Sequence, residues 1–101
     1  MTANADYNAV ADCVRGNGGS RVLALDNEHA VRLAVLTGIP SVAAPTNFSR
    51  LSPAEIGLFM AKYRIDFVLA FTPEEEQAFV TRWPAQRLAN CTPIALDVRR
   101  R

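Results

Sequence analysis

The chain has 101 residues, of which 50% are hydrophobic and 21% are charged. This length and balance predict a single ordinary globular domain over residues 1–101 and exclude a second hydrophobic core. A formal net charge of +1 gives no electrostatic reason to expect binding to nucleic acid, to acidic ligands or to a membrane surface.

The compartment is inferred from what the sequence lacks. No apolar stretch approaches the roughly 20 residues that span a bilayer, and no signal peptide is recognisable before the first predicted helix. We therefore expect a cytoplasmic protein without membrane association. In a reducing cytosol, Cys13 and Cys91 are expected to be small buried apolar residues, because they are too few and too far apart for a metal-binding motif.

Residues 1–19 are predicted to form a helix followed by a glycine-rich loop. A helix over about residues 4–15 is indicated by apolar side chains with i, i+3, i+4, i+7 spacing, which are Tyr7, Val10, Ala11 and Val14. Gly16, Asn17, Gly18 and Gly19 end it. A phosphate-binding glycine loop follows a strand and precedes a helix, and the order here is the opposite, which disfavours phosphate binding.

The next segment predicts a strand, a helix and a second strand. Residues 21–25 form a short apolar strand, after which Asp26 or Asn27 can cap a helix and Glu28 suits its positive end. Gly38 lies where a helix needs a left-handed C-terminal residue, and Pro40 prevents continuation. Residues 41–44 then form the second strand.

Two further helices have clear start signals. Ser52 and Glu55 form a capping box with Pro53 at the first helical position, so a helix should run from there to about Tyr63. The apolar run that begins at Ile65 predicts a buried strand.

That strand leads directly into a helix. Thr72 fits its N-cap and Pro73 its first turn, and the Glu75 side chain can reach back to the Thr72 amide. The helix should end or kink at Trp83-Pro84, residues 93–98 give a fourth strand, and residues 99–101 form a frayed basic tail.

The element order is thus one helix followed by β-α-β-α-β-α-β. Each crossover is long enough for a right-handed parallel connection. We therefore predict an α/β fold, a small doubly wound, Rossmann-like sheet of four parallel strands with an extra N-terminal helix.

Residues 21–98 also resemble a Toprim domain, the catalytic fold of bacterial primases, type II and IA topoisomerases and some nucleases. In the primase form, a strand ends in glutamate-glycine, the following helix closes on alanine or glycine-isoleucine, and a third strand ends in Asp-x-Asp. The matching segments are residues 22–26, 36–39, 51–55 and 68–71. The resemblance implies a parallel sheet of order 2-1-3-4, in which the first and third strands are neighbours.

The residues that carry Toprim chemistry differ in this chain. The family's glutamate, a general acid or base, aligns with Asp26, and the glycine after it aligns with Asn27. The magnesium-binding Asp-x-Asp aligns with Thr72, Pro73 and Glu74, so one metal carboxylate is replaced by a hydroxyl. Glu74 together with Glu75, Glu76 or Asp26 remains an alternative set of ligands for Mg²⁺.

Each candidate residue also has a structural explanation. Glutamates in the first turn of a helix are stabilised there without any metal, and Asp26 is explained as a helix cap. His29 fits a surface histidine, with a proton shuttle as the alternative. Thr46, Asn47 and Ser49 follow the second strand and are candidates to face a ligand, although this segment also suits an ordinary loop.

These observations favour a non-catalytic Toprim-like binding or accessory module, linked to nucleic-acid metabolism through a protein or nucleic-acid partner and without a cofactor. The alternative is a small Mg²⁺- or Mn²⁺-dependent nuclease or phosphotransferase that uses Asp26 and Glu74. The sequence does not identify the partner, because arginines are spread along the chain at positions 15, 21, 32, 50, 64, 82 and 87.

Overall fold

The computed structural model describes residues 7–88, 91 and 94–99. The helices are α1 (Tyr7–Gly16), α2 (Asn27–Thr37), the 3-10 helix η1 (Phe48–Arg50), α3 (Pro53–Tyr63) and α4 (Pro73–Val80). The strands are β1 (Val22–Ala24), β2 (Ser41–Ala43), β3 (Phe67–Ala70), β4 (Gln86–Arg87) and β5 (Ile94–Asp97). None of the helices in the described part of the chain is long and apolar enough to cross a membrane.

The first three strands are arranged as predicted. The sheet order is β2-β1-β3-β5-β4, and β1 pairs in parallel with β2 on one side and with β3 on the other. Leu23 of β1 lies opposite Val42 of β2 and Val68 of β3. The α/β class and the position of the first strand between the second and the third are therefore confirmed.

The prediction of four parallel strands is wrong, because the last segment returns as a hairpin. β5 is antiparallel to β3, with Phe67 opposite Asp97 and Ala70 opposite Ile94, and it also pairs antiparallel with the unpredicted strand β4. The crossover through α4 ends at β4, which is parallel to β3, and β5 then fills the space between them. β4 escaped prediction because its two residues are polar and exposed.

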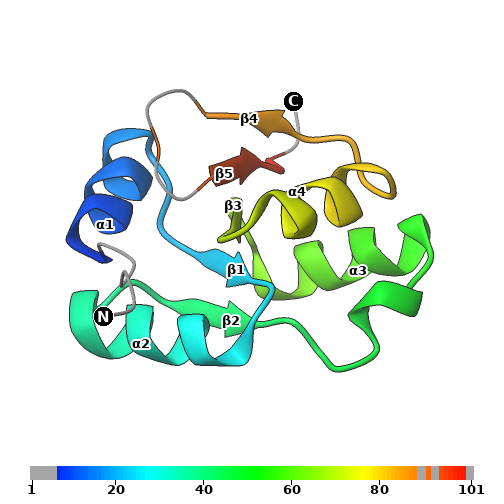
Figure 1. Cartoon of the computed structure of the whole chain (residues 1–101), viewed down its shortest axis with the longest axis horizontal. Helices are drawn as coiled ribbons and strands as arrows, with labels where there is room; N and C mark the ends of the chain where they lie inside the picture. The colour runs from blue at the N-terminus through cyan, green and yellow to red at the C-terminus, as the bar shows by residue number, and fades with distance from the viewer. Residues whose placement is uncertain (1–6, 89–90, 92–93, 100–101) are drawn as a thin grey trace.

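Helices cover both faces of the sheet, with α1 and α2 on one side and α3 and α4 on the other (Figure 1). The core is accordingly divided in two. The α1/α2 side buries Val14, Leu33 and Phe67, and the α3/α4 side buries Ile56, Val68 and Phe79. β3 is buried along its whole length, which explains the apolar run in this part of the sequence.

The predicted helix ends are largely confirmed. The Ser52 hydroxyl accepts from the Glu55 amide at 3.2 Å, and the Ser52 amide donates to the Glu55 carboxylate at 2.8 Å, which completes the capping box. Gly38 ends α2 with a φ of 77°. α4 ends at Val80, slightly before the predicted Trp83-Pro84 position.

The two chain ends are described only in part. The start of the predicted first helix, residues 4–6, and the last two residues of the tail lie outside the described residues. Arg99 does not belong to a frayed tail, because its amide and its guanidinium both donate to the Asp97 carboxylate.

The glycine-rich loop after α1 has a structural role. Gly18 has a φ of 77°, a conformation that side chains disfavour. At Gly19, a Cβ atom would overlap the ring of Phe67, which is fully buried in the sheet. The loop therefore uses its glycines to turn and to approach β3 closely.

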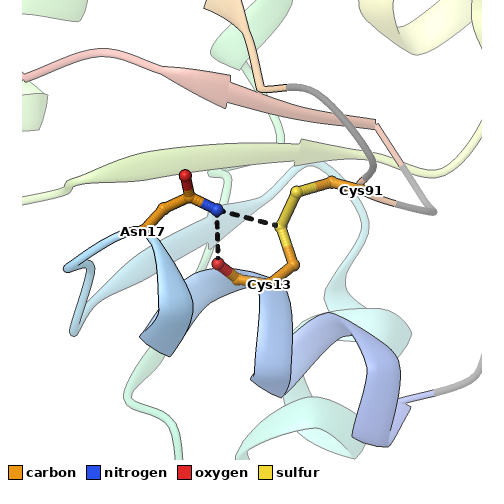
Figure 2. Close-up of a disulfide and its surroundings, with 3 residues drawn as sticks. All are labelled: Cys13, Asn17 and Cys91. Carbon is orange, nitrogen blue, oxygen red and sulfur yellow. Dashed lines mark hydrogen bonds between the residues drawn. A yellow bond between two sulfur atoms is a disulfide. The ribbon is translucent and has the colours of Figure 1, made fainter.

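The prediction that the two cysteines are unpaired apolar residues is wrong. Cys13 of α1 and Cys91, between β4 and β5, form a disulfide with a Cα–Cα distance of 5.7 Å (Figure 2). Asn17 donates its side-chain amide to the Cys13 carbonyl at 2.8 Å. With a sequence separation of 78 between the cysteines, the pairing has no local sequence signal, and the assumption of a reducing cytosol argued against it.

Candidate functional site

The carboxyl ends of β1, β2 and β3 meet at one edge of the sheet. The connection from β1 leads through α2 to β2 on one side, and α3 then crosses back to β3 on the other side. Ligands of open α/β sheets usually bind at such a switch point. Ala24 lies opposite Leu69, so Asp26 and Phe71, each two residues further, emerge from neighbouring strands.

Asp26 and His29 form a close pair at this edge. Asp26 caps α2 by accepting the His29 amide at 3.3 Å, and its Oδ2 atom lies 2.7 Å from Nδ1 of His29. Nδ1 is buried, and this contact meets the distance but not the full geometry of a hydrogen bond. The imidazole also stacks on the Phe71 ring, with 3.8 Å between centroids and 8° between planes. His29 is therefore held in place and is not a simple surface histidine.

Tyr7 of α1 extends this group, which we call the Asp26–His29 cluster and define as Tyr7, Asp26, His29 and Phe71. The Tyr7 ring lies 6.5 Å from the Phe71 ring. Burial is the main cause that raises the pKa of Tyr7 above its ordinary value of 10.0, and the nearby carboxylates add to it while Arg32 opposes it. The cluster thus combines aromatic rings with one carboxylate at the start of α2.

The first turn of α4 is committed to bonds within the protein. The Thr72 hydroxyl accepts from the Glu75 amide at 3.1 Å, as predicted. The Glu75 carboxylate accepts from the Phe71 amide at 2.8 Å, one residue earlier than the predicted Thr72 amide. Glu76 forms a two-pronged ion pair with Arg87 of β4, with N–O distances of 2.6 and 2.9 Å. Glu74 is exposed.

The predicted metal ligands do not converge. Among the described residues, no group of three or more histidine, cysteine, aspartate or glutamate side chains is placed to hold a metal ion. Asp26 is next to His29, and Glu75 and Glu76 point to partners of their own.

A cavity of about 240 Å³ opens at the same edge, on the α3/α4 side. Its polar lining consists of Thr46, Ser49, Glu75 and Arg82, and its apolar lining includes Phe48 and Phe79. The prediction that Thr46 faces a ligand site fits this lining, whereas Asn47 precedes η1 and is not part of it.

Arg82 is a charged residue of this cavity that the sequence did not indicate as part of a site. Its guanidinium donates to the Leu51 carbonyl and lies 5.9 Å from the Phe48 ring centroid. No sequence signal marks it, because both partners lie on a different segment of the chain.

Comparison with protein families, curated proteins and solved structures gives no match. The likeness to Toprim domains therefore rests on the sequence segments named above.

Most of the dispersed arginines are bound to the protein's own oxygens. Arg15 donates to the Thr37 carbonyl at 2.8 Å and Arg21 to the Tyr63 carbonyl at 3.2 Å. Arg32 pairs with Glu28, and Arg82 and Arg87 are held as described. The two others, Arg50 and Arg64, lie before and after α3, a helix of 11 residues that spans roughly 16 Å. Five of these seven arginines are thus engaged with oxygens of the described chain.

Proposed function

We propose that this chain is a non-catalytic, Toprim-like binding module that acts through a partner at the carboxyl edge of its sheet. The observation that carries the proposal is that three of the four carboxylates at this edge are engaged within the protein, while Glu74 is exposed. Asp26 caps α2 and contacts His29, Glu75 holds the Phe71 amide, and Glu76 holds Arg87. A catalytic Toprim site needs such acids to be available for a metal and for proton transfer.

The partner that this proposal favours is a protein. A nucleic-acid surface needs cations that converge on phosphates, and five of the seven dispersed arginines donate to oxygens of this chain. The cavity beside Thr46 is lined mainly by apolar side chains with a few polar groups, and its volume of about 240 Å³ suits a side chain of a partner protein. The link to nucleic-acid metabolism follows only from the Toprim resemblance.

The disulfide also bears on where the module works. Disulfides persist in oxidising compartments and are rare in the cytosol. The Cys13–Cys91 bond therefore favours an oxidising compartment over the expected cytoplasmic location.

The catalytic alternative is tested by activity. Wild type, Asp26→Ala and Glu74→Ala are incubated with single- and double-stranded DNA in the presence of Mg²⁺ or Mn²⁺, and we expect no cleavage by any of them. The same ions should leave the melting temperature unchanged, because we expect no bound ion. An ion that binds only the folded state would raise the melting temperature. Cleavage by the wild type that either substitution abolishes would establish the nuclease alternative instead.

The binding role is tested by comparing matched variants in affinity capture from the source cell. Thr46→Arg changes the lining of the edge cavity, whereas Leu58→Arg makes a similar change on the exposed face of α3. A partner of the proposed kind is retained by wild type and Leu58→Arg and lost with Thr46→Arg. A protein retained equally by all three does not bind at this edge, which contradicts the proposal.

A further inference from the structure

A larger cavity lies at the opposite end of the sheet from the candidate site. Its volume is about 560 Å³, which is within the usual range of small-molecule sites. It opens beside Ile65 and Asp66, which precede β3, and beside Val98 and Arg99, which follow β5. Because β3 and β5 are antiparallel, these two segments meet at the same end of the sheet. The carboxyl edge with the Asp26–His29 cluster therefore takes no part in this cavity.

The lining of this cavity is mostly apolar. Its buried part is aliphatic and consists of Met60, Ile65 and Val98. One wall is the face of α3 that carries residues 54, 57, 58 and 61, and Leu58 on this face is 72% exposed. Trp83 forms the adjoining wall, and its indole ring packs directly on the helix, because a Cβ atom at Gly57 would lie 3.1 Å from it. The cavity therefore suits a ligand with an apolar body.

Three charged residues line the cavity, and two of them are engaged within the protein. The Arg99 guanidinium donates to the Asp97 carboxylate at 2.9 and 3.1 Å. The Asp66 carboxylate accepts from two backbone amides of the segment before β1, at 2.8 and 3.3 Å. The third residue, Arg64, is exposed, and no carbonyl or carboxylate of the described residues accepts from its guanidinium. An unpaired positive charge thus lies beside an apolar cavity.

The backbone of Arg64 also indicates a role for its side chain. Arg64 ends α3 with a φ of 55° and a ψ of 49°, and among the described residues it is the one non-glycine with a positive φ. The corresponding residue at the end of α2 is Gly38, and glycine adopts this conformation without strain. Strained residues of this kind cluster at ligand sites, where the side chain has a function.

We propose that this cavity binds a small organic anion with an apolar body and one carboxylate, which Arg64 holds. A guanidinium matches a carboxylate with two parallel hydrogen bonds. One unpaired cation balances the single charge of a carboxylate, whereas a phosphate monoester carries up to about two charges. The apolar body of the ligand contacts Trp83 and Leu58 and covers the aliphatic lining. The inference is independent of the binding function proposed above, because the two cavities share no lining residue.

Fluorescence of Trp83, the only tryptophan in the sequence, reports binding at this wall. Titration of the full chain with phenylbutyrate should give a saturable change. The neutral amide of the same compound should bind at least about tenfold more weakly, because it lacks the charge. Arg64→Gly should weaken the binding of phenylbutyrate by a similar factor. Arg50→Gln removes an exposed arginine outside the cavity and should bind phenylbutyrate as the wild type does.

Arg64→Gly also separates recognition from stability. Glycine relieves the strain of a positive φ, so this variant should melt at the same temperature as the wild type or higher. Backbone amide chemical shifts give the position of the ligand, and phenylbutyrate should move the signals of Arg64 and Val98 and leave those of α2 unchanged.

The proposal is overturned if the wild type shows no saturable change up to about 10 mM phenylbutyrate. Equal binding of the acid and its neutral amide also overturns it, and so does unimpaired binding by Arg64→Gly or an equal loss in Arg50→Gln. Binding that moves the α2 signals and not those of Arg64 and Val98 places the ligand elsewhere and has the same consequence.

Discussion

Removal of the Cys13–Cys91 disulfide should destabilise the domain strongly. The bond closes a loop with a sequence separation of 78, and the chain-entropy relation gives about 15 cal/mol/K for such a loop, or about 4.5 kcal/mol at 25 °C. Measured values are usually lower, at about 2–4 kcal/mol. For a domain of this size, that loss lowers the melting temperature by about 10–20 °C.

Reduction of the disulfide and substitution of both cysteines should destabilise the domain equally. Wild type is unfolded in urea with and without reductant, and the Cys13→Ala/Cys91→Ala double variant is unfolded in parallel. Reduction and the double substitution should lower the midpoint by similar amounts, and the double variant should not respond to reductant. Alkylation of the native, unreduced protein followed by mass spectrometry should find no reactive thiol.

Alkylation tests whether the disulfide forms, and the urea midpoint tests whether it stabilises the fold. Two alkylated thiols before reduction would show that the bond does not form in solution. An intact bond whose reduction leaves the midpoint unchanged would show that the loop-entropy argument fails for this fold.

Two further predictions concern a helix cap and an ionisable ring. Ser52→Ala should lower the unfolding free energy by about 1 kcal/mol, because the capping box of α3 loses its acceptor; an unchanged denaturation midpoint contradicts this. Burial and the neighbouring carboxylates raise the pKa of Tyr7 above 10.0, so the folded state holds this proton more tightly than the unfolded state. The corresponding stability is complete below pH 10.0 and is lost as the pH rises through the folded-state pKa. Tyr7→Phe should therefore lose less stability in alkali than wild type, with Tyr63→Phe as the control for a lost hydroxyl, and equal alkaline slopes would contradict the reasoning.

Sequence reasoning worked best where a signal and its structural effect lie within one helical turn. Ser52 and Thr72 each cap a helix three residues from the amide they bind, and Gly38 adopts the left-handed conformation at the end of α2. The parallel arrangement of the first three strands followed from the helices that separate them. The last strand was misassigned because pairing between β3 and β5 is decided by a hairpin whose first strand has only two residues.

The sequence predicted which edge of the sheet carries these residues, but not the contacts of their side chains. Asp26, His29 and Thr72 do lie at the carboxyl edge, because parallel strands bring their ends together. The side-chain partners could not be predicted from the sequence, because they are distant along the chain. His29 stacks on Phe71 at the end of another strand, and Glu76 pairs with Arg87, 11 residues away. These long-range contacts decide which carboxylates are engaged within the protein.

The position of β5 inside the sheet links folding to the order of synthesis. β5 is the last strand of the described chain, yet it lies between β3 and β4 and buries Ala95 and Leu96. While a ribosome is still adding residues before 94, one side of β3 has no strand to pair with, and the Cys13 thiol still lacks its partner at position 91 or has only just gained it. The central layer therefore closes only after residues 94–97 have emerged, whereas all strands of the β2-β1-β3 half are present once Ala70 has been added.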